Sequence, residues 1–407
     1  MDCKKKKKTL SATSIVILAL TCIPAVSAGN VAATGEGRPA GNDMLTPEYR
    51  LCEEGLKQSR MNDSDKALQL FTKAISCNSG YARAYLNRGC TFRLAKQDMP
   101  ARQDFKRVTQ LINAPRSCAD HFMLGTALQE LGKHEAAISH LQAATALKPL
   151  TLLDRMCRSR SYIALGDLEN ANLAISDYLQ ENPQSAPAYV LRADISTLTE
   201  ARLEQAVQDL SRAIALEPAY RTALTKRAAL YNRMGKYSSG FEDGKTASLL
   251  EPDNPDVLLS LGISHQGLGE PQAAMAAFKK VISLDETWNV PYLYLADLNS
   301  LQGHDGIALS LATRAIELEP QDPNGYFCRA RILHKANRLT EALQDVNQGI
   351  QRDNHRGLRG SNLRDKIEKA LDEQSRLKAI LLLFLNGAVL FGAFSGRREQ
   401  TTPALSN

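Results

Sequence analysis

A period of about 34 residues runs through the middle of the chain and limits what it can fold into. The clearest copies are LGTALQELGKHEAAISHLQAATALKP at 124–149 and LGISHQGLGEPQAAMAAFKKVISLDE at 261–286. Nine copies, spaced by 34 to 36 residues, begin at Glu48, Ala82, Cys118, Leu152, Ala186, Arg221, Pro255, Asn289 and Pro323. A unit this short cannot bury its apolar face alone. The period therefore predicts an elongated stack of similar units rather than a compact globule.

Each copy has the pattern of two helices joined by a turn. The eighth position is small in every copy, as Gly55, Gly89, Gly125, Ser159, Ala193, Ala228, Gly262, Ala296 and Ala330. The twentieth is small as well, as Ala67, Ala101, Ala137, Ala171, Ala206, Gly240, Ala274, Ala308 and Ala342. Two helices approach closely only where both carry such side chains. Glycine between the two halves and proline after the second half, as at Gly132 and Pro149, predict a turn and a helix end.

This pattern resembles the tetratricopeptide repeat family over residues 48–356. The resemblance implies an all-α fold, a right-handed superhelical solenoid of about nine helix-turn-helix repeats. It also implies that partner proteins or peptides bind along an inner wall formed by the first helices. The chain departs from the family at the fourth position, where tryptophan is frequent in the family. Here tyrosine or aliphatic residues stand instead, the tyrosines being Tyr85, Tyr189, Tyr292 and Tyr326.

Five repeats carry arginine at the seventh position, and four of these five are the only repeats with aspartate at the equivalent of the twenty-third. The matched residues are Arg88 with Asp104, Arg192 with Asp209, Arg227 with Asp243, and Arg329 with Asp345. Arg158 is an arginine at the seventh position without such a partner. An arginine and a carboxylate that pair satisfy both charges, whereas one left alone in a partly buried place is costly. We therefore predict structural ion pairs between the two helices of these repeats, in preference to ligand contacts.

The resemblance also implies candidate residues for a peptide groove at the fifth, ninth and twelfth positions of the first helices. These candidates include Arg93, Phe122, Met156, Arg160, Asp194, Asn232, Asp297 and Arg331. The alternative for each of these residues is that its side chain lies on a solvent-exposed face or packs against a neighbouring repeat. The subset of the family that holds a C-terminal carboxylate uses lysine at the fifth and asparagine at the ninth position of one helix. No copy here has that combination, so we assign no such ligand.

Both ends of the chain carry apolar segments. Lys4–Lys8, an apolar run and Val26-Ser27-Ala28 predict a signal peptide at 1–28, with an uncleaved anchor as the alternative. A flexible leader at 29–47 follows. Beyond the repeats we expect a capping helix at 357–378, a transmembrane helix at 379–396 and a short tail at 397–407, the alternative being a second buried capping helix. The repeats would then lie outside the cytoplasm, held at the membrane by this C-terminal helix.

The sequence predicts no catalytic site, metal site or cofactor. It has no phosphate-binding glycine motif in a strand-to-helix context and no His-Glu-x-x-His motif. Six cysteines lie beyond residue 28, and we expect mostly small core residues, with one disulfide among the first five left open. Without residues 1–28, 45 basic residues face 43 acidic ones, which gives no signal for nucleic acid. We expect no small-molecule substrate either.

These observations predict an exported, membrane-tethered, non-enzymatic scaffold that binds proteins or peptides on its repeats. Two alternatives remain open. One is a structural component that self-associates or packs into a large assembly, and the other is an accessory subunit of an enzyme complex.

Overall fold

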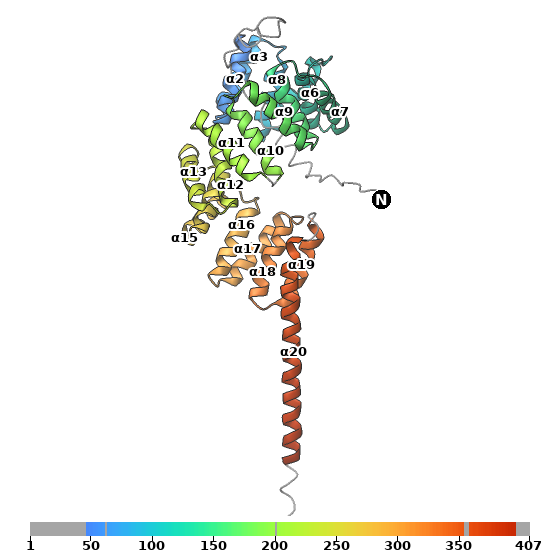
Figure 1. Cartoon of the computed structure of the whole chain (residues 1–407), viewed down its shortest axis with the longest axis vertical. Helices are drawn as coiled ribbons and strands as arrows, with labels where there is room; N and C mark the ends of the chain where they lie inside the picture. The colour runs from blue at the N-terminus through green and yellow to red at the C-terminus, as the bar shows by residue number, and fades with distance from the viewer. Residues whose placement is uncertain (1–45, 62, 200–201, 354–357, 396–407) are drawn as a thin grey trace, which may run out of the picture. The chain divides into compact units, whose positions relative to one another are not determined.

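The computed structural model describes residues 46–61, 63–199, 202–353 and 358–395, with the backbone alone for 358–359 and 379–395. The predicted signal peptide, nearly all of the leader and the C-terminal tail lie outside these residues. Within them, all regular structure is helical, which confirms the all-α prediction. Nine helix pairs are followed by one long helix (Figure 1).

The helix bounds follow the repeat closely. Seven of the nine first helices begin at the predicted residue, and the other two begin one residue away. The first helices are α2 (Pro47–Arg60), α4 (Ala82–Leu94), α6 (Cys118–Glu130), α8 (Leu152–Ala164), α10 (Ala186–Leu198), α12 (Arg221–Arg233), α14 (Pro255–Gly267), α16 (Val290–Leu301) and α18 (Pro323–Lys335). The second helices are α3 (Ser64–Cys77), α5 (Asp98–Leu111), α7 (His134–Ala146), α9 (Leu168–Glu181), α11 (Leu203–Leu216), α13 (Tyr237–Leu250), α15 (Pro271–Leu284), α17 (Asp305–Leu318) and α19 (Leu339–Arg352).

In seven of the nine hairpins, the described part of the turn contains a residue with a left-handed backbone. Glycine supplies it in five hairpins, with φ between 73° and 83°, at Gly132, Gly166, Gly235, Gly269 and Gly303. Lys96 (φ 57°) and Asn337 (φ 60°) take the same conformation in the second and ninth repeats. The hairpin turn is therefore set locally, mostly by the residue type that the sequence pattern singled out.

The small residues of the repeat lie where the two helices of a hairpin cross. A Cβ added at Gly262 would come within 2.5 Å of the Phe278 ring, and one added at Gly55 within 2.7 Å of the Phe71 ring. Ala274, on the partner helix of Gly262, is fully buried. In the four hairpins with glycine at the eighth position, the close crossing thus depends on an aromatic or aliphatic side chain of the second helix that fills the space left by glycine.

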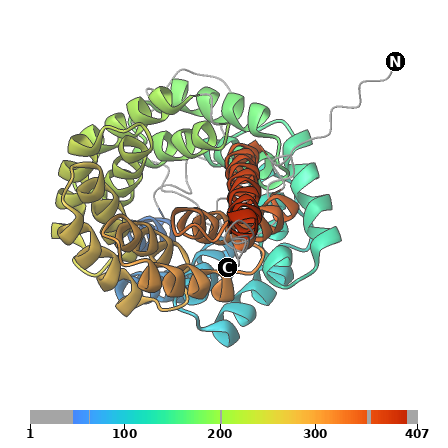
Figure 2. The same cartoon turned by 90° about the horizontal axis from the view of Figure 1, so that it is seen from below.

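The chain divides into two compact units. The first ends at Pro252 and holds α2 to α13, and the second begins at Asp253 and holds α14 to α20. Within the first unit, the hairpins follow one another along a curved row from α2 to α13 (Figure 2). Contacts inside each unit join neighbouring hairpins, as expected for a solenoid.

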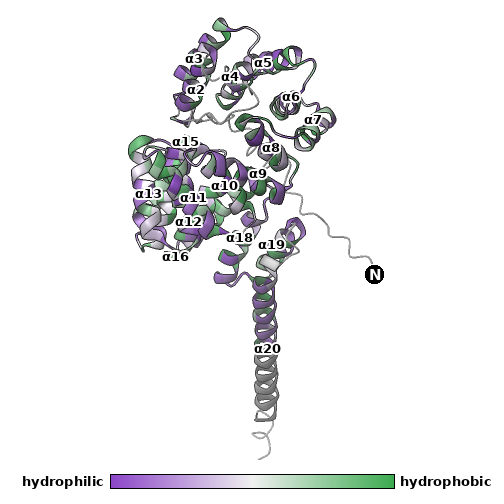
Figure 3. Cartoon of the chain, turned by 45° about the horizontal axis from the view of Figure 1, so that its top comes forward, coloured by the Kyte–Doolittle hydropathy of each residue, from purple (hydrophilic) through white to green (hydrophobic). Residues whose placement is uncertain are grey.

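The last helix, α20 (Leu358–Ser395), is continuous across the predicted capping helix and the predicted membrane segment. Its first part packs Leu363, Ile367 and Leu371 against the ninth hairpin, and hydrophilic residues cover the rest of that part (Figure 3). Leu363, Ile367 and Leu371 thus cover part of the apolar face of the ninth hairpin. Among the residues that the structure describes, no helix is both long enough and apolar enough to cross a membrane.

All six cysteines beyond residue 28 carry free thiols, so the disulfide left open in the sequence does not form. Five of them are buried, and Cys77 is exposed. Cys52, Cys90 and Cys157 belong to hydrophobic clusters between hairpins, as expected for small core residues.

Candidate protein-binding surface

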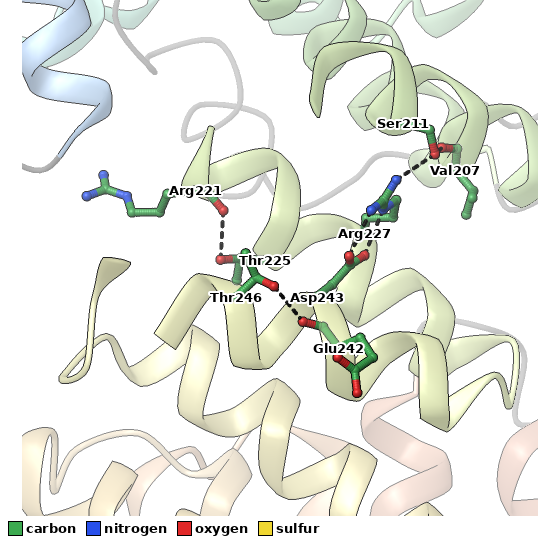
Figure 4. Close-up of polar contacts among 8 residues, drawn as sticks. All are labelled: Val207, Ser211, Arg221, Thr225, Arg227, Glu242, Asp243 and Thr246. Atoms are coloured by element: carbon green, nitrogen blue, oxygen red, sulfur yellow. Dashed lines mark hydrogen bonds and ion pairs between the residues drawn. The ribbon is translucent and has the colours of Figure 1, made fainter. Parts of the chain in front are cut away.

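The four arginines that the sequence matches with aspartate each hold it with two parallel hydrogen bonds. Arg227 Nε donates to Asp243 Oδ2 at 2.7 Å, and Nη2 donates to Oδ1 at 2.8 Å (Figure 4). The other three pairs repeat this geometry at 2.6–2.9 Å. The aspartate hydrogen bonds raise the pKa of Arg88, Arg192, Arg227 and Arg329 above the usual arginine value. These residues join α-helices within a repeat and offer little to a ligand.

A third partner, which the sequence reasoning missed, extends three of these pairs to the preceding repeat. Arg227 Nη1 donates to Ser211 Oγ on α11 at 2.8 Å (Figure 4). Arg88 makes the same bond to Thr72 Oγ1 at 3.1 Å, and Arg329 makes it to Thr313 Oγ1 at 3.2 Å. We call this set of arginine, aspartate and preceding hydroxyl the clamp. It ties three helices together across a repeat boundary.

The signal for the hydroxyl was present in the sequence. Serine or threonine occupies the twenty-fifth position only in the four repeats that precede an Arg–Asp repeat, as Thr72, Ser176, Ser211 and Thr313. The other five repeats have Lys106, Gln142, Lys245, Lys279 and Asn347 there. Arg158, which lacks an aspartate, donates instead to the carbonyl oxygen of Thr145 in the preceding repeat at 3.1 Å. Comparing positions across neighbouring repeats, rather than within one repeat, would have found the clamp.

Four of the eight groove candidates are buried. Phe122, Met156, Arg160 and Asn232 expose between 0% and 6% of their surface. Phe122 packs in a cluster with Cys90 of the preceding repeat and Cys157 of the following one. Phe122 thus fills the space between neighbouring first helices, whereas Asn232 lies against Gly240 of the second helix in its own hairpin.

The other four candidates form ion pairs between first helices of adjacent repeats. Arg93 approaches Glu130 of the next repeat at 3.3 Å and also binds Asp98 of its own repeat at 2.9 Å. Asp194 accepts from Lys226 at 2.7 Å. Two of the candidates, Asp297 and Arg331, pair with one another at 2.8 Å. The sequence found both members of this last pair, but it missed Glu130 and Lys226, the partners in the other two.

One stretch of the first-helix wall in the second unit combines accessible charges with an exposed apolar side chain. We call it the α16–α18 face and define it by Asp297, Leu301, Arg331 and Lys335. Leu301 is 75% exposed, and the side chains of Arg331 and Lys335 are about half exposed. Lys335 lies 3.5 Å from Asp305 and also donates to the Ser300 carbonyl oxygen, beside Leu301. Adjacent helices therefore present alternating charges around a solvent-exposed leucine.

The environment of this face raises the pKa values of Arg331 and of the nearby Cys328 thiol. Burial alone would lower the pKa of Arg331, but the Asp297 carboxylate reverses this and holds it above its usual value. Cys328 Sγ lies 3.5 Å from Asp297 Oδ1. Burial, with the Asp297 charge in second place, raises the pKa of this thiol far above its ordinary range. A thiol held protonated is a poor nucleophile, so the face has the chemistry of a contact surface.

Two further polar clusters lie in the first unit. The nearly buried Arg83 contacts Glu53 at 2.7 Å and lies over the Tyr49 ring. Burial raises the pKa of Glu53, and the Arg83 charge opposes that rise. His121 and His140 share a hydrogen bond between their Nδ1 atoms at 3.0 Å. Among the residues that the structure describes, no three His, Cys, Asp or Glu side chains gather in the way that a metal ion requires.

Known proteins share the repeat. Family models described as tetratricopeptide repeat match residues 122–186, 255–287 and 311–344. The human protein O-mannosyl-transferase TMTC3 is 24% identical over 65% of this chain and 27% of its own length. The wheat (Triticum aestivum) Hsp70-Hsp90 organizing protein is 36% identical over 21% of this chain and 14% of its own. The chain thus spans about a quarter or less of these two relatives.

A solved structure agrees on the fold. The crystal structure of the APC/C hetero-tetramer Cut9-Hcn1 matches with a TM-score of 0.58 at 13% identity, over 81% of this chain and 64% of that one. At this identity the likeness concerns the fold alone.

Proposed function

Because the chain belongs to the tetratricopeptide repeat family, we propose that it is a non-enzymatic scaffold that binds partner proteins or peptides through the α16–α18 face. The observation that carries this proposal is the exposure of Leu301 on α16, next in the chain to Ser300, whose carbonyl oxygen accepts from the half-exposed Lys335 of α18. Interface cores are built around exposed apolar anchors with a polar rim, and this face has both.

The charges of the face do not oppose binding. Ion pairs between half-exposed side chains contribute only about 0–1 kcal/mol each. A partner that brings its own carboxylate to Arg331 or Lys335 therefore exchanges one weak pair for another. The gain comes from covering Leu301, because burial of a leucine side chain contributes roughly 1.5–3 kcal/mol. In the first unit, the candidates Phe122, Met156 and Arg160 are buried.

The named functions of the relatives are consistent with binding rather than catalysis as the shared role. One of the two relatives is named as an organizing protein for two other proteins. The other is named as a transferase, but this chain spans 27% of its length. We therefore extend to this chain the role of holding other proteins and not the transferase activity.

Site-specific cross-linking tests the proposed surface. A photo-reactive amino acid is placed at position 301, with position 249 as the matched control, because Leu249 is 79% exposed on a second helix. We expect a discrete cross-linked partner from position 301 and none from position 249. The same products from both positions would show non-specific contact, and no product from position 301 would refute the surface.

We further propose that the repeats are exported and held at a membrane through residues 379–396. This part of the proposal rests on the sequence of the two ends, on Lys4–Lys8 with its apolar run and on the uncharged stretch Ala379–Ser395. Protease added to intact cells or spheroplasts should reach the repeats, and a chain that ends at Lys378 should leave the membrane fraction. Full protection of the repeats would refute export, and an unchanged distribution of the shortened chain would refute the tether.

A further inference from the structure

The hairpin of repeat 3 brings two histidines into contact. His121 on α6 and His140 on α7 are 19 residues apart in the sequence, and their Nδ1 atoms lie 3.0 Å apart. The ring centroids are 5.2 Å apart, and the ring planes are tilted by 44°. Both residues are half-buried rather than enclosed in the core. Because they belong to different helices, no local sequence motif marks the pair.

Two other repeats hold an arginine where repeat 3 has this pair. The histidines are the fourth and the twenty-third residues of their repeat, and repeat 2 has Tyr85 and Asp104 at these positions. Arg88 binds that aspartate and lies 5.6 Å from the centre of the tyrosine ring. Repeat 5 has the same arrangement. In repeat 3 the arginine is replaced by Leu124, which supplies no positive charge to the two histidines.

The spacing of the two nitrogens matches that of two ligands of one metal ion. At metal–nitrogen bond lengths of about 2.0–2.1 Å, two nitrogens bound at right angles lie about 3 Å apart, and two bound at a tetrahedral angle lie about 3.4 Å apart. The observed 3.0 Å therefore fits adjacent positions of a square or octahedral ion better than those of a tetrahedral one. Imidazole is a good ligand for Ni²⁺ and Cu²⁺, and both ions accept ligands at right angles.

The protons of the pair allow this exchange. Without a metal ion, one Nδ1 donates a hydrogen bond to the other. With a metal ion, both neutral rings carry their proton on Nε2, and both Nδ1 lone pairs are available to the ion, so no net proton is released. Cys118, one turn before His121, donates to the Leu147 carbonyl oxygen at 3.5 Å instead. Among the described residues no third His, Cys, Asp or Glu completes a metal-binding group, so water supplies the other ligands.

We propose that His121 and His140 form a binding site for a divalent transition metal ion that accepts ligands at right angles, such as Ni²⁺ or Cu²⁺. The ion joins α6 to α7 through the fourth and twenty-third positions, as arginine does in repeats 2 and 5. It thereby stabilises the hairpin of repeat 3. This inference rests on the geometry of the histidine pair and does not depend on the proposed binding function.

Nickel binding to the full-length chain, without a histidine tag and freed of metal by EDTA, tests the site. Isothermal titration with NiCl₂ measures the Kd. We expect His121→Gln and His140→Gln each to weaken binding at least about tenfold, because loss of a residue that merely orients a ligand already weakens metal affinity by about 10- to 100-fold. His134→Gln is the matched control, since His134 is exposed on the same helix as His140, and should change the Kd less than about twofold. Equal Kd values for all four proteins would overturn the proposal and assign the bound nickel to adventitious sites.

Two further measurements separate metal binding from a structural effect of the substitutions. X-ray absorption of the nickel complex should show two imidazole ligands in the wild-type chain. Added NiCl₂ should raise the Tm of the wild-type chain and of His134→Gln but not of His121→Gln or His140→Gln, because an ion that binds only the folded state stabilises it. MgCl₂ should not raise it, since Mg²⁺ prefers oxygen ligands. A nickel spectrum without imidazole, or an equal rise in Tm with MgCl₂, would refute the site.

Discussion

Arg227 and Asp243 lie on the two helices of one repeat and meet through two parallel hydrogen bonds of 2.7 and 2.8 Å. The side chains are 18% and 11% exposed, so water screens the pair only partly. The same arrangement recurs in three other repeats, which makes it a feature of the chain and not an isolated contact.

Removal of Asp243 alone should therefore destabilise the protein more than removal of both partners. We expect Asp243→Ala to lower the free energy of unfolding by about 3 kcal/mol, because Arg227 is left partly buried without its carboxylate. The double variant Arg227→Ala/Asp243→Ala should recover at least about 1 kcal/mol relative to additivity. Urea unfolding of the wild-type protein, the two single variants and the double variant measures these free energies. Asp253→Ala, which breaks an exposed pair with Lys280, is the control and should change stability by less than about 1 kcal/mol. Strict additivity at Arg227 and Asp243 would mean that the pair does not stabilise the repeat.

Gly262→Ala should destabilise the seventh hairpin even though alanine favours a helix. The new Cβ would lie 2.5 Å from the Phe278 ring, and overpacking of this kind costs about 1–3 kcal/mol. Gly306→Ala is the matched control on α17, where an added Cβ meets no heavy atom within 4 Å, and it should stabilise by roughly 0.5–1 kcal/mol. Thermal unfolding of both variants gives the comparison. We expect Tm to fall for Gly262→Ala and to rise for Gly306→Ala. A higher Tm for both variants would contradict the close crossing of α14 and α15.

The hydrogen-bonded pair of His121 and His140 should make stability depend on pH. Burial, and then the neighbouring His140, lowers the pKa of His121 in the folded state below its value of about 6.5 in the unfolded chain. As the pH falls below about 6.5, the unfolded state therefore binds protons first, and the free energy of unfolding decreases until the folded pKa is reached. Denaturant titrations between pH 7.5 and 5 should show this loss, and His121→Gln should reduce it. His134→Gln, an exposed histidine of the same repeat, should leave the profile unchanged. A profile that does not respond to His121→Gln would exclude the pair as its source.

Arg83 and Arg314 both pair with glutamate, but the two pairs differ in burial. The side chains of Arg83 and Glu53 are 3% and 16% exposed, whereas those of Arg314 and Glu317 are 50% and 58% exposed. Arg83→Met should lower the free energy of unfolding by about 3–4 kcal/mol, because it leaves the carboxylate of Glu53 buried without the cation it pairs with. Arg314→Met should cost only a small fraction of this. Chemical denaturation measures the free energy of unfolding of the two variants. Similar losses would show that burial of the Arg83 pair contributes little to stability.

The sequence predicted the hairpins well because each is defined locally. Small residues such as Gly262 and turn residues such as Gly269 act within one repeat, so the period alone locates helix starts to within a residue. The pairing of Arg227 with Asp243 could be predicted for the same reason, since both belong to one hairpin.

The inner wall was harder to predict because it depends on how one repeat packs on the next. Phe122 was expected in a groove, but it fills the space between its own first helix and those on either side. Asp194 was expected to face a ligand, and the lysine that approaches it lies one repeat further along. Such partners follow from side-chain reach between helices, which a pattern within one repeat does not encode.

The binding function is tested most directly by the affinity of a partner, once cross-linking has identified it, for two variants of the full chain. Leu301→Asp places a charge at the exposed apolar residue of the α16–α18 face, and Leu249→Asp makes the same change at a similarly exposed leucine on a second helix. The account predicts at least a tenfold loss of affinity for Leu301→Asp and less than a twofold change for Leu249→Asp. Equal affinities for the two variants would contradict it.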